Sequence, residues 1–145
     1  VICIPSGITE VEKRAVQEVL GRGGTTHWGY FADDTVDDLQ QAGWLWTEEI
    51  FAKSGIDANS NVLEIGCGNG AVSIWLEQRT GCSVVGLDLS SIRIEQTKKA
   101  LEAHPGQKVR FVCGTITDLP FADGEFTHVW GQGVLYHVPD IDGAC

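Results

Sequence analysis

Three glycines at alternate positions, Gly66, Gly68 and Gly70, follow the apolar run VLEI and precede the helical pattern AVSIWL. Glycine is needed where a chain turns sharply from a strand into a helix and where a ligand must approach the backbone without meeting a Cβ atom. The same segment satisfies G-x-G-x-x-A through Gly66, Gly68 and Ala71, a spacing that dinucleotide-binding proteins use. This glycine turn, residues 66–70, therefore predicts a nucleotide-type cofactor and leaves its identity open.

Two acidic residues narrow the choice of cofactor. Glu64 lies just before the first glycine, so its carboxylate would face the turn, where it repels a diphosphate and favours an ammonium or sulfonium group. Asp88 ends the next apolar run, 22 residues after Gly66, the distance at which a carboxylate accepts hydrogen bonds from the two ribose hydroxyls. Asp88 would otherwise cap the following helix, but Ser90 serves that purpose. Together the two carboxylates favour a cationic nucleoside ligand.

The elements that must position these residues follow a regular alternation. Short apolar runs are separated by helical segments, which is typical of parallel strands joined by crossover helices. The fold class is therefore predicted to be α/β. The predicted strands are 61–65, 83–88, 109–113 and 126–130, and the predicted helices between the first three of them are 70–80 and 90–103.

The N-terminal part of the chain has a different pattern. A capping box at Thr9 predicts one helix, and a second is expected to begin near Thr35 and to end before Gly55. We therefore expect an N-terminal helical or lid segment at 1–57 and a cofactor-binding domain at 58–145.

Composition and charge exclude several classes of protein. The 145 residues are 43% hydrophobic and 21% charged, which predicts a folded chain with a real core. A net charge of -10 repels phosphate backbones and anionic bilayers, so no nucleic-acid and no membrane partner is expected. The five cysteines are odd in number and contain no C-x-x-C pair, which predicts reduced thiols and a cytoplasmic location. The four histidines are scattered, so no metal site is expected.

Four motifs in order, VLEIGCGNG, VVGLDLS, LPFADGEF and VLYHVPD, resemble those of the Rossmann-like S-adenosylmethionine-dependent methyltransferases. The resemblance covers residues 58–140 and is nearest to the branch that acts on small molecules and lipids. It implies a three-layer Rossmann-like parallel sheet with the strand order 3-2-1-4. It also implies S-adenosyl-L-methionine as the cofactor, S-adenosyl-L-homocysteine as the product and a small molecule as the methyl acceptor.

The resemblance assigns each part of the cofactor to residues of this chain. Asp88 would hold the ribose, and Leu89 would lie against the adenine. The backbone of Gly131 and Gln132 would run past the methionine end of the cofactor. The cradle for the methionine part would consist of Glu64, Gly66, Cys67, Gly68 and Gly70.

The sequence departs from the family pattern after the third strand. The family usually has glycine, aspartate and alanine there, with the aspartate meeting the adenine amino group, whereas this chain has Gly114, Thr115 and Ile116. The Thr115 hydroxyl can still accept a hydrogen bond, and Ile116 can pack on the ring. Asp118 would either cap the loop or supply the missing carboxylate from three positions later.

The resemblance also assigns two residues to the methyl acceptor and one more to the cofactor. Tyr136 and His137 match the pair that faces the acceptor in the family, and His137 would take a proton as the acceptor is methylated. His137 can equally be a polar turn residue. Tyr30 resembles a tyrosine that folds over the cofactor in related enzymes, and it can equally pack an N-terminal lid onto the domain.

Two other functions are compatible with the glycine turn: a nicotinamide-dependent (NAD(P)-binding) oxidoreductase and a non-catalytic fragment for cofactor binding or interaction. Members of the resembled family continue past the fourth strand, whereas this chain ends at Cys145. We therefore expect an incomplete, truncated catalytic domain in which methyl transfer is impaired. The exposed edge of the fourth strand would favour a homo-oligomer.

Overall fold

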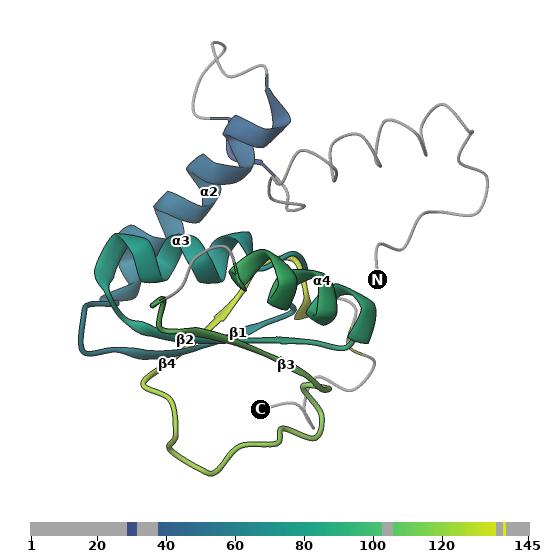
Figure 1. Ribbon diagram of the computed structural model, residues 1–145. Helices are drawn as coiled ribbons and strands as arrows, with labels where there is room; N and C mark the ends of the chain where they lie inside the picture. Colours follow the sequence, from purple (N-terminus) through teal and green to yellow (C-terminus); the bar gives the residue numbers. More distant parts are fainter. Residues whose placement is uncertain (1–28, 32–37, 103–105, 136–137, 139–145) are drawn as a thin grey trace, which may run out of the picture. The chain divides into compact units, whose positions relative to one another are not determined.

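The computed structural model describes residues 29–31, 38–102, 106–135 and 138 (Figure 1). The chain divides into two compact units, Val1–Ile50 and Phe51–Cys145. Helix α2, Leu39–Ser54, begins in the first unit. In that unit the backbone N–H of Tyr30 donates to the carbonyl of Ala42 at 2.8 Å. The helix expected after Thr9 lies outside the described residues.

Helix α2 begins at Leu39 rather than near Thr35. The carboxylate of Asp38 accepts hydrogen bonds from the backbone N–H groups of Gln40 at 2.7 Å and Gln41 at 3.0 Å. These are two of the N–H groups that a helix start leaves without a partner, so Asp38 is the capping residue. Thr35 itself lies outside the described residues.

The second unit is built on a parallel sheet in which all four strands run in the same direction. The strand order is β3-β2-β1-β4, which confirms the predicted order and the α/β fold class. Because every strand points the same way, the carboxyl ends of all four meet at one edge, called the carboxyl edge below. The strands are β1 Asn61–Ile65, β2 Ser83–Asp88, β3 Val109–Cys113 and β4 His128–Gly131.

Two helices connect the first three strands and cover the same face of the sheet (Figure 1). Helix α3, Ala71–Thr80, follows β1, and helix α4, Ser91–Glu102, follows β2. Both lie within one residue of the predicted ranges 70–80 and 90–103. Their buried side chains include Leu76 on α3 and Ile94 on α4, which close this side of the core.

The other face of the sheet is covered by the irregular connection between β3 and β4, which lies opposite α3 and α4 in Figure 1. Its Phe121 and Phe126 rings meet edge to face at 5.0 Å between centroids. In the part of the chain that the structure describes, this third layer contains no helix. The rings pack on the core residues Leu63, Ile65, Val85 and Leu87.

Strand β4 begins at His128, whereas the apolar run predicts a start at Phe126. Two contacts explain the difference. Phe126 turns its ring onto Phe121, and the hydroxyl of Thr127, rather than a backbone carbonyl, accepts the N–H of Asn61 at 2.9 Å. The regular ladder with β1 therefore starts at His128, two residues after the predicted start.

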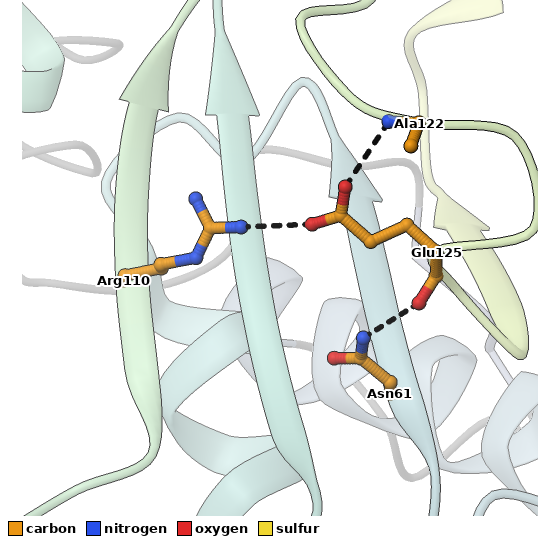
Figure 2. A network of polar contacts seen from close by, with 4 residues as sticks. All are labelled: Asn61, Arg110, Ala122 and Glu125. Carbon is orange, nitrogen blue, oxygen red and sulfur yellow. Dashed lines mark hydrogen bonds and ion pairs between the residues drawn. The ribbon is translucent and has the colours of Figure 1, made fainter.

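Glu125 connects the β3–β4 segment to the sheet through hydrogen bonds at the edge opposite the carboxyl edge (Figure 2). One carboxylate oxygen of Glu125 accepts a hydrogen bond from Arg110 of β3 at 3.2 Å, and the other accepts the N–H of Ala122 at 3.1 Å. Its backbone carbonyl accepts the Asn61 side-chain amide at 2.8 Å. The guanidinium of Arg110 also lies 5.5 Å from the ring centre of Phe121.

We expect Glu125→Gln to lower the free energy of unfolding by less than about 1 kcal/mol, because the ion pair with Arg110 is partly exposed and screened by solvent. Glu125→Ala should lower it by about 1–2 kcal/mol, because the Ala122 N–H loses its acceptor as well. Urea unfolding at low and high salt measures both values. Two variants with the wild-type midpoint would show that Glu125 does not fasten the connection.

Candidate cofactor site

The glycine turn leaves β1 and enters α3 with all three glycines in the left-handed region, at φ values of 68° for Gly66, 55° for Gly68 and 74° for Gly70. Residues with a Cβ rarely adopt this conformation, which explains why three glycines are present. The Gly70 N–H donates to the Cys67 carbonyl at 2.8 Å and closes the turn. The turn lies at the carboxyl edge, where open α/β sheets bind their ligands.

The three glycines differ in what surrounds them. A Cβ on Gly70 would lie 2.5 Å from a methyl carbon of Thr97, and one on Gly66 would lie 2.6 Å from a methyl carbon of Val134. These two glycines let neighbouring elements pack closely. Among the residues that the structure describes, a Cβ on Gly68 would meet only the Arg93 guanidinium, at 3.4 Å. Gly68 therefore presents bare backbone that a ligand can approach.

Asp88 is brought directly to this bare backbone. Its Oδ2 accepts the N–H of Gly68 at 2.8 Å, and its Oδ1 accepts the N–H of Ser90 at 2.9 Å. Each carboxylate oxygen has more than one lone pair, so both can still accept a hydroxyl donor. The Ser90 side chain accepts the N–H of Arg93 at 3.4 Å, which confirms Ser90 as the N-cap of α4.

Glu64 is 3% exposed and faces the first turn of α3, where the fully buried Ser73 donates its hydroxyl hydrogen to Oε2 of Glu64. Burial raises the pKa of Glu64 to about 7, the Ser73 hydrogen bond partly offsets the increase, and the charge of Asp88 adds to it. The carboxyl group thus lies beneath the glycine turn. Near neutral pH its neutral and ionised forms are therefore both populated.

The adenine side of the predicted site contains one strongly exposed apolar side chain, because Leu89 is 68% exposed just beyond β2. Thr115 and Asp118 pair through an isolated antiparallel bridge, and the Thr115 hydroxyl lies 2.9 Å from that of Thr117. Ile116 packs partly against the sheet core. The bridge brings Asp118 beside the position where the sequence has Thr115.

The remaining predicted site residues are placed as follows. Gly131 ends β4 next to Ile65, and the buried Gln132 accepts the Trp130 indole N–H at 3.0 Å. Burial and the charges of Glu64 and Asp88 raise the pKa of the Cys67 thiol, which therefore stays protonated. Tyr30 belongs to the first unit, where its ring centre lies 6.4 Å from that of Trp46. Tyr136 and His137 lie outside the described residues.

Two residues of the site were not singled out from the sequence. Ser73 is a polar residue on the buried stripe of α3, beside Val72 and Leu76. A polar residue on an apolar helix stripe indicates a buried hydrogen bond, and this pattern can be recognised in the sequence. Arg93 carries no comparable signal, because its place beside Gly68 depends on how α4 packs.

Within the described ranges, no cluster of His, Cys, Asp and Glu suits a metal ion, and no helix is long and apolar enough to cross a bilayer.

A matched pair of variants tests whether Gly70 is required for packing as well as for its backbone conformation. Gly70 and Gly81 share the same φ of 74°, but no atom of the described part of the chain lies within 4 Å of a Cβ on Gly81. Gly81→Ala should therefore cost only about 1–2 kcal/mol of stability. Gly70→Ala should cost at least about 2 kcal/mol more, because its Cβ collides with Thr97 and Phe111. Equal losses in urea unfolding would contradict the steric account.

Comparison with known proteins identifies the family. A family described as a methyltransferase domain matches residues 62–144. Methyltransferase GfsG of Streptomyces halstedii is 31% identical over 118 residues, which cover 80% of this chain and 42% of that protein. The 27-O-demethylrifamycin SV methyltransferase of Amycolatopsis mediterranei is 29% identical over 119 residues, which cover 81% of this chain and 43% of that protein.

The fold is shared with solved structures. The crystal structure of the cyclase SpnF superimposes with a TM-score of 0.82 at 22% identity, covering 91% of this chain and 49% of that one. The chain thus spans less than half the length of these two relatives and about half of this structure. The profile match covers more than half of the sequence and the glycine turn lies inside it, so the chain belongs to the methyltransferase domain family.

Proposed function

We propose that this chain binds S-adenosylmethionine at the glycine turn and serves in methyl transfer to a small-molecule acceptor. The observation that carries the proposal is the hydrogen bond from the Gly68 N–H to Asp88 at 2.8 Å. This bond places the Asp88 carboxylate beside the bare backbone of Gly68 at the carboxyl edge, and the carboxylate can still accept two hydroxyl donors. A carboxylate at this position can bind the two ribose hydroxyls, and bare backbone lets a nucleoside approach closely.

The residues around Asp88 fit the rest of the cofactor. Leu89 offers an exposed apolar surface for the adenine, and Thr115, Ile116 and Asp118 follow β3, the strand that pairs with β2. Glu64 and Asp88 together favour a ligand that carries positive charge. This fit supports S-adenosylmethionine over a nicotinamide dinucleotide, whose diphosphate would lie near the two carboxylates.

The relatives support the reaction and the class of acceptor. Both are named methyltransferases, and one is named for a 27-O-demethylrifamycin, which is a small molecule. The fold alone does not determine the reaction, because one protein that shares it is named a cyclase. The identity of the acceptor therefore belongs to the proposal.

In the proposed mechanism, S-adenosylmethionine supplies an activated methyl group that needs no protein nucleophile. The chain's own residues bind the cofactor, orient it toward the acceptor and exclude water from the site. Asp88 and the glycine turn fix the nucleoside, and Gly131 and Gln132 follow the methionine end. We propose that Tyr136 and His137 face the acceptor and that the His137 imidazole takes the proton that the acceptor loses. Tyr30 is proposed to fold over the cofactor.

The organisation of the chain belongs to the same proposal. Residues 58–145 would carry the cofactor site, and residues 1–57 would form the N-terminal segment. The three described cysteines, Cys67, Cys82 and Cys113, are free thiols, which supports a proposed cytoplasmic location.

Replacing Asp88 tests the site. Asp88→Ala should weaken the binding of S-adenosylhomocysteine about a hundredfold, because two hydrogen bonds to a charged acceptor are worth on the order of 3 kcal/mol. Asp57→Ala is the matched control, because Asp57 also accepts a backbone N–H, from Asn59 at 2.9 Å, but precedes β1 at the opposite edge. Calorimetric titration should show wild-type affinity for the control. A dissociation constant unchanged by Asp88→Ala would remove Asp88 from the site.

We also propose that two copies associate through β4. This strand pairs with β1, no described residue pairs with its other edge, and Val129 on it is 65% exposed. An unpaired apolar edge favours association with another strand. Sedimentation velocity should find a dimer for the wild type and a monomer for Val129→Lys. A wild-type chain that stays monomeric at high concentration would contradict this proposal.

A further inference from the structure

The contact between Ser73 and Glu64 joins the end of β1 to the start of α3 beneath the glycine turn. Ser73 has no exposed surface, and its hydroxyl donates to Oε2 of Glu64. In the sheet, Glu64 stands between Gly86 of β2 and Trp130 of β4, neither of which carries a charge. Ser73 is therefore the polar partner that the structure gives to this buried acid.

The charged and titratable groups around Glu64 come from three neighbouring segments. Asp88, at the end of β2, disfavours a negative charge on Glu64. Cys67, in the glycine turn, feels the charge of Glu64 but keeps its own proton. Arg93, from α4, acts with its positive charge on Cys67 and favours the ionised thiol. Burial and Asp88 thus favour the neutral acid, and the hydrogen bond from Ser73 favours the carboxylate.

We propose that Ser73 is a positioning residue that keeps Glu64 ready to ionise, so that binding of the cofactor's ammonium group releases a proton from Glu64 to solvent. The inference rests on the proposed function, because it needs a positively charged group of the ligand in the glycine turn. A cation there favours the ionised form of the acid. Ser73 itself need not touch the ligand.

The protonation state of Glu64 in the chain without ligand determines how affinity changes with pH. Below about pH 7 Glu64 is mostly protonated, and only the ionised fraction is ready to bind a cation. Affinity should therefore rise as the pH rises through 7 and level off above it. Removing the Ser73 hydroxyl takes away a hydrogen bond to the ionised form, which should move this midpoint upward by about one pH unit.

The experiment compares the wild type, Ser73→Ala and Ser60→Ala. Ser60 is a matched control, because it is also buried and donates to a carboxylate, Asp57, at 3.1 Å, but it precedes β1 at the opposite edge. Calorimetry gives the dissociation constant of S-adenosylhomocysteine, which keeps the ammonium group, between about pH 5.5 and 8.5, a range that brackets the expected titration. The carbon-13 signal of the Glu64 carboxyl group reports its titration in the free chains.

We expect Ser73→Ala to bind S-adenosylhomocysteine about fivefold more weakly than the wild type at pH 7 and nearly as tightly at pH 8.5. Its Glu64 signal should titrate at higher pH, and Ser60→Ala should match the wild type in both measurements. Ser73→Thr restores a hydroxyl and should return both midpoints toward the wild-type values. Glu64→Gln should bind weakly with no pH dependence across this range.

Two results would overturn the inference while leaving the proposed function in place. One is a wild-type affinity that does not change with pH, which needs no variant to fold. The other is a folded Ser73→Ala chain with wild-type midpoints in both measurements. Failure of the wild type to bind S-adenosylhomocysteine at any pH would overturn the proposed function and this inference together.

Discussion

The carboxylate of Asp88 holds together the three segments that make the site. One oxygen accepts the N–H of Gly68 in the glycine turn, and the other accepts the N–H of Ser90 before α4. Because Asp88 ends β2, these bonds fix the turn and the helix start against the carboxyl edge of the sheet. A nucleoside that binds there meets a carboxylate already held in place, so little conformational freedom is lost on binding.

Much of this arrangement is readable from sequence because it depends on local patterns. The strands 61–65, 83–88 and 109–113 have the predicted boundaries, since each apolar run is bounded by turn or helix signals. The glycine spacing and the cap at Ser90 are local in the same way. The later start of β4 and the pairing of Ser73 with Glu64 are different, because they arise when segments distant in the sequence meet.

Burial of Glu64 costs the fold some stability. Burying an acid is unfavourable unless it is neutral or well paired, and the chain gives Glu64 one hydroxyl donor and a nearby negative charge. Perturbed acids of this kind gather at functional sites. A protein named as a cyclase shares the fold at 22% identity, so the fold by itself does not determine the chemistry.

The most direct test of the central claim is a map of backbone amide signals by nuclear magnetic resonance while S-adenosylhomocysteine is added. We expect the largest shifts at Gly66, Gly68 and Leu89, and we expect Asn61 and Glu125 at the opposite edge to stay unchanged. Saturating ligand that leaves the glycine turn unshifted, or that shifts the opposite edge instead, would contradict the account.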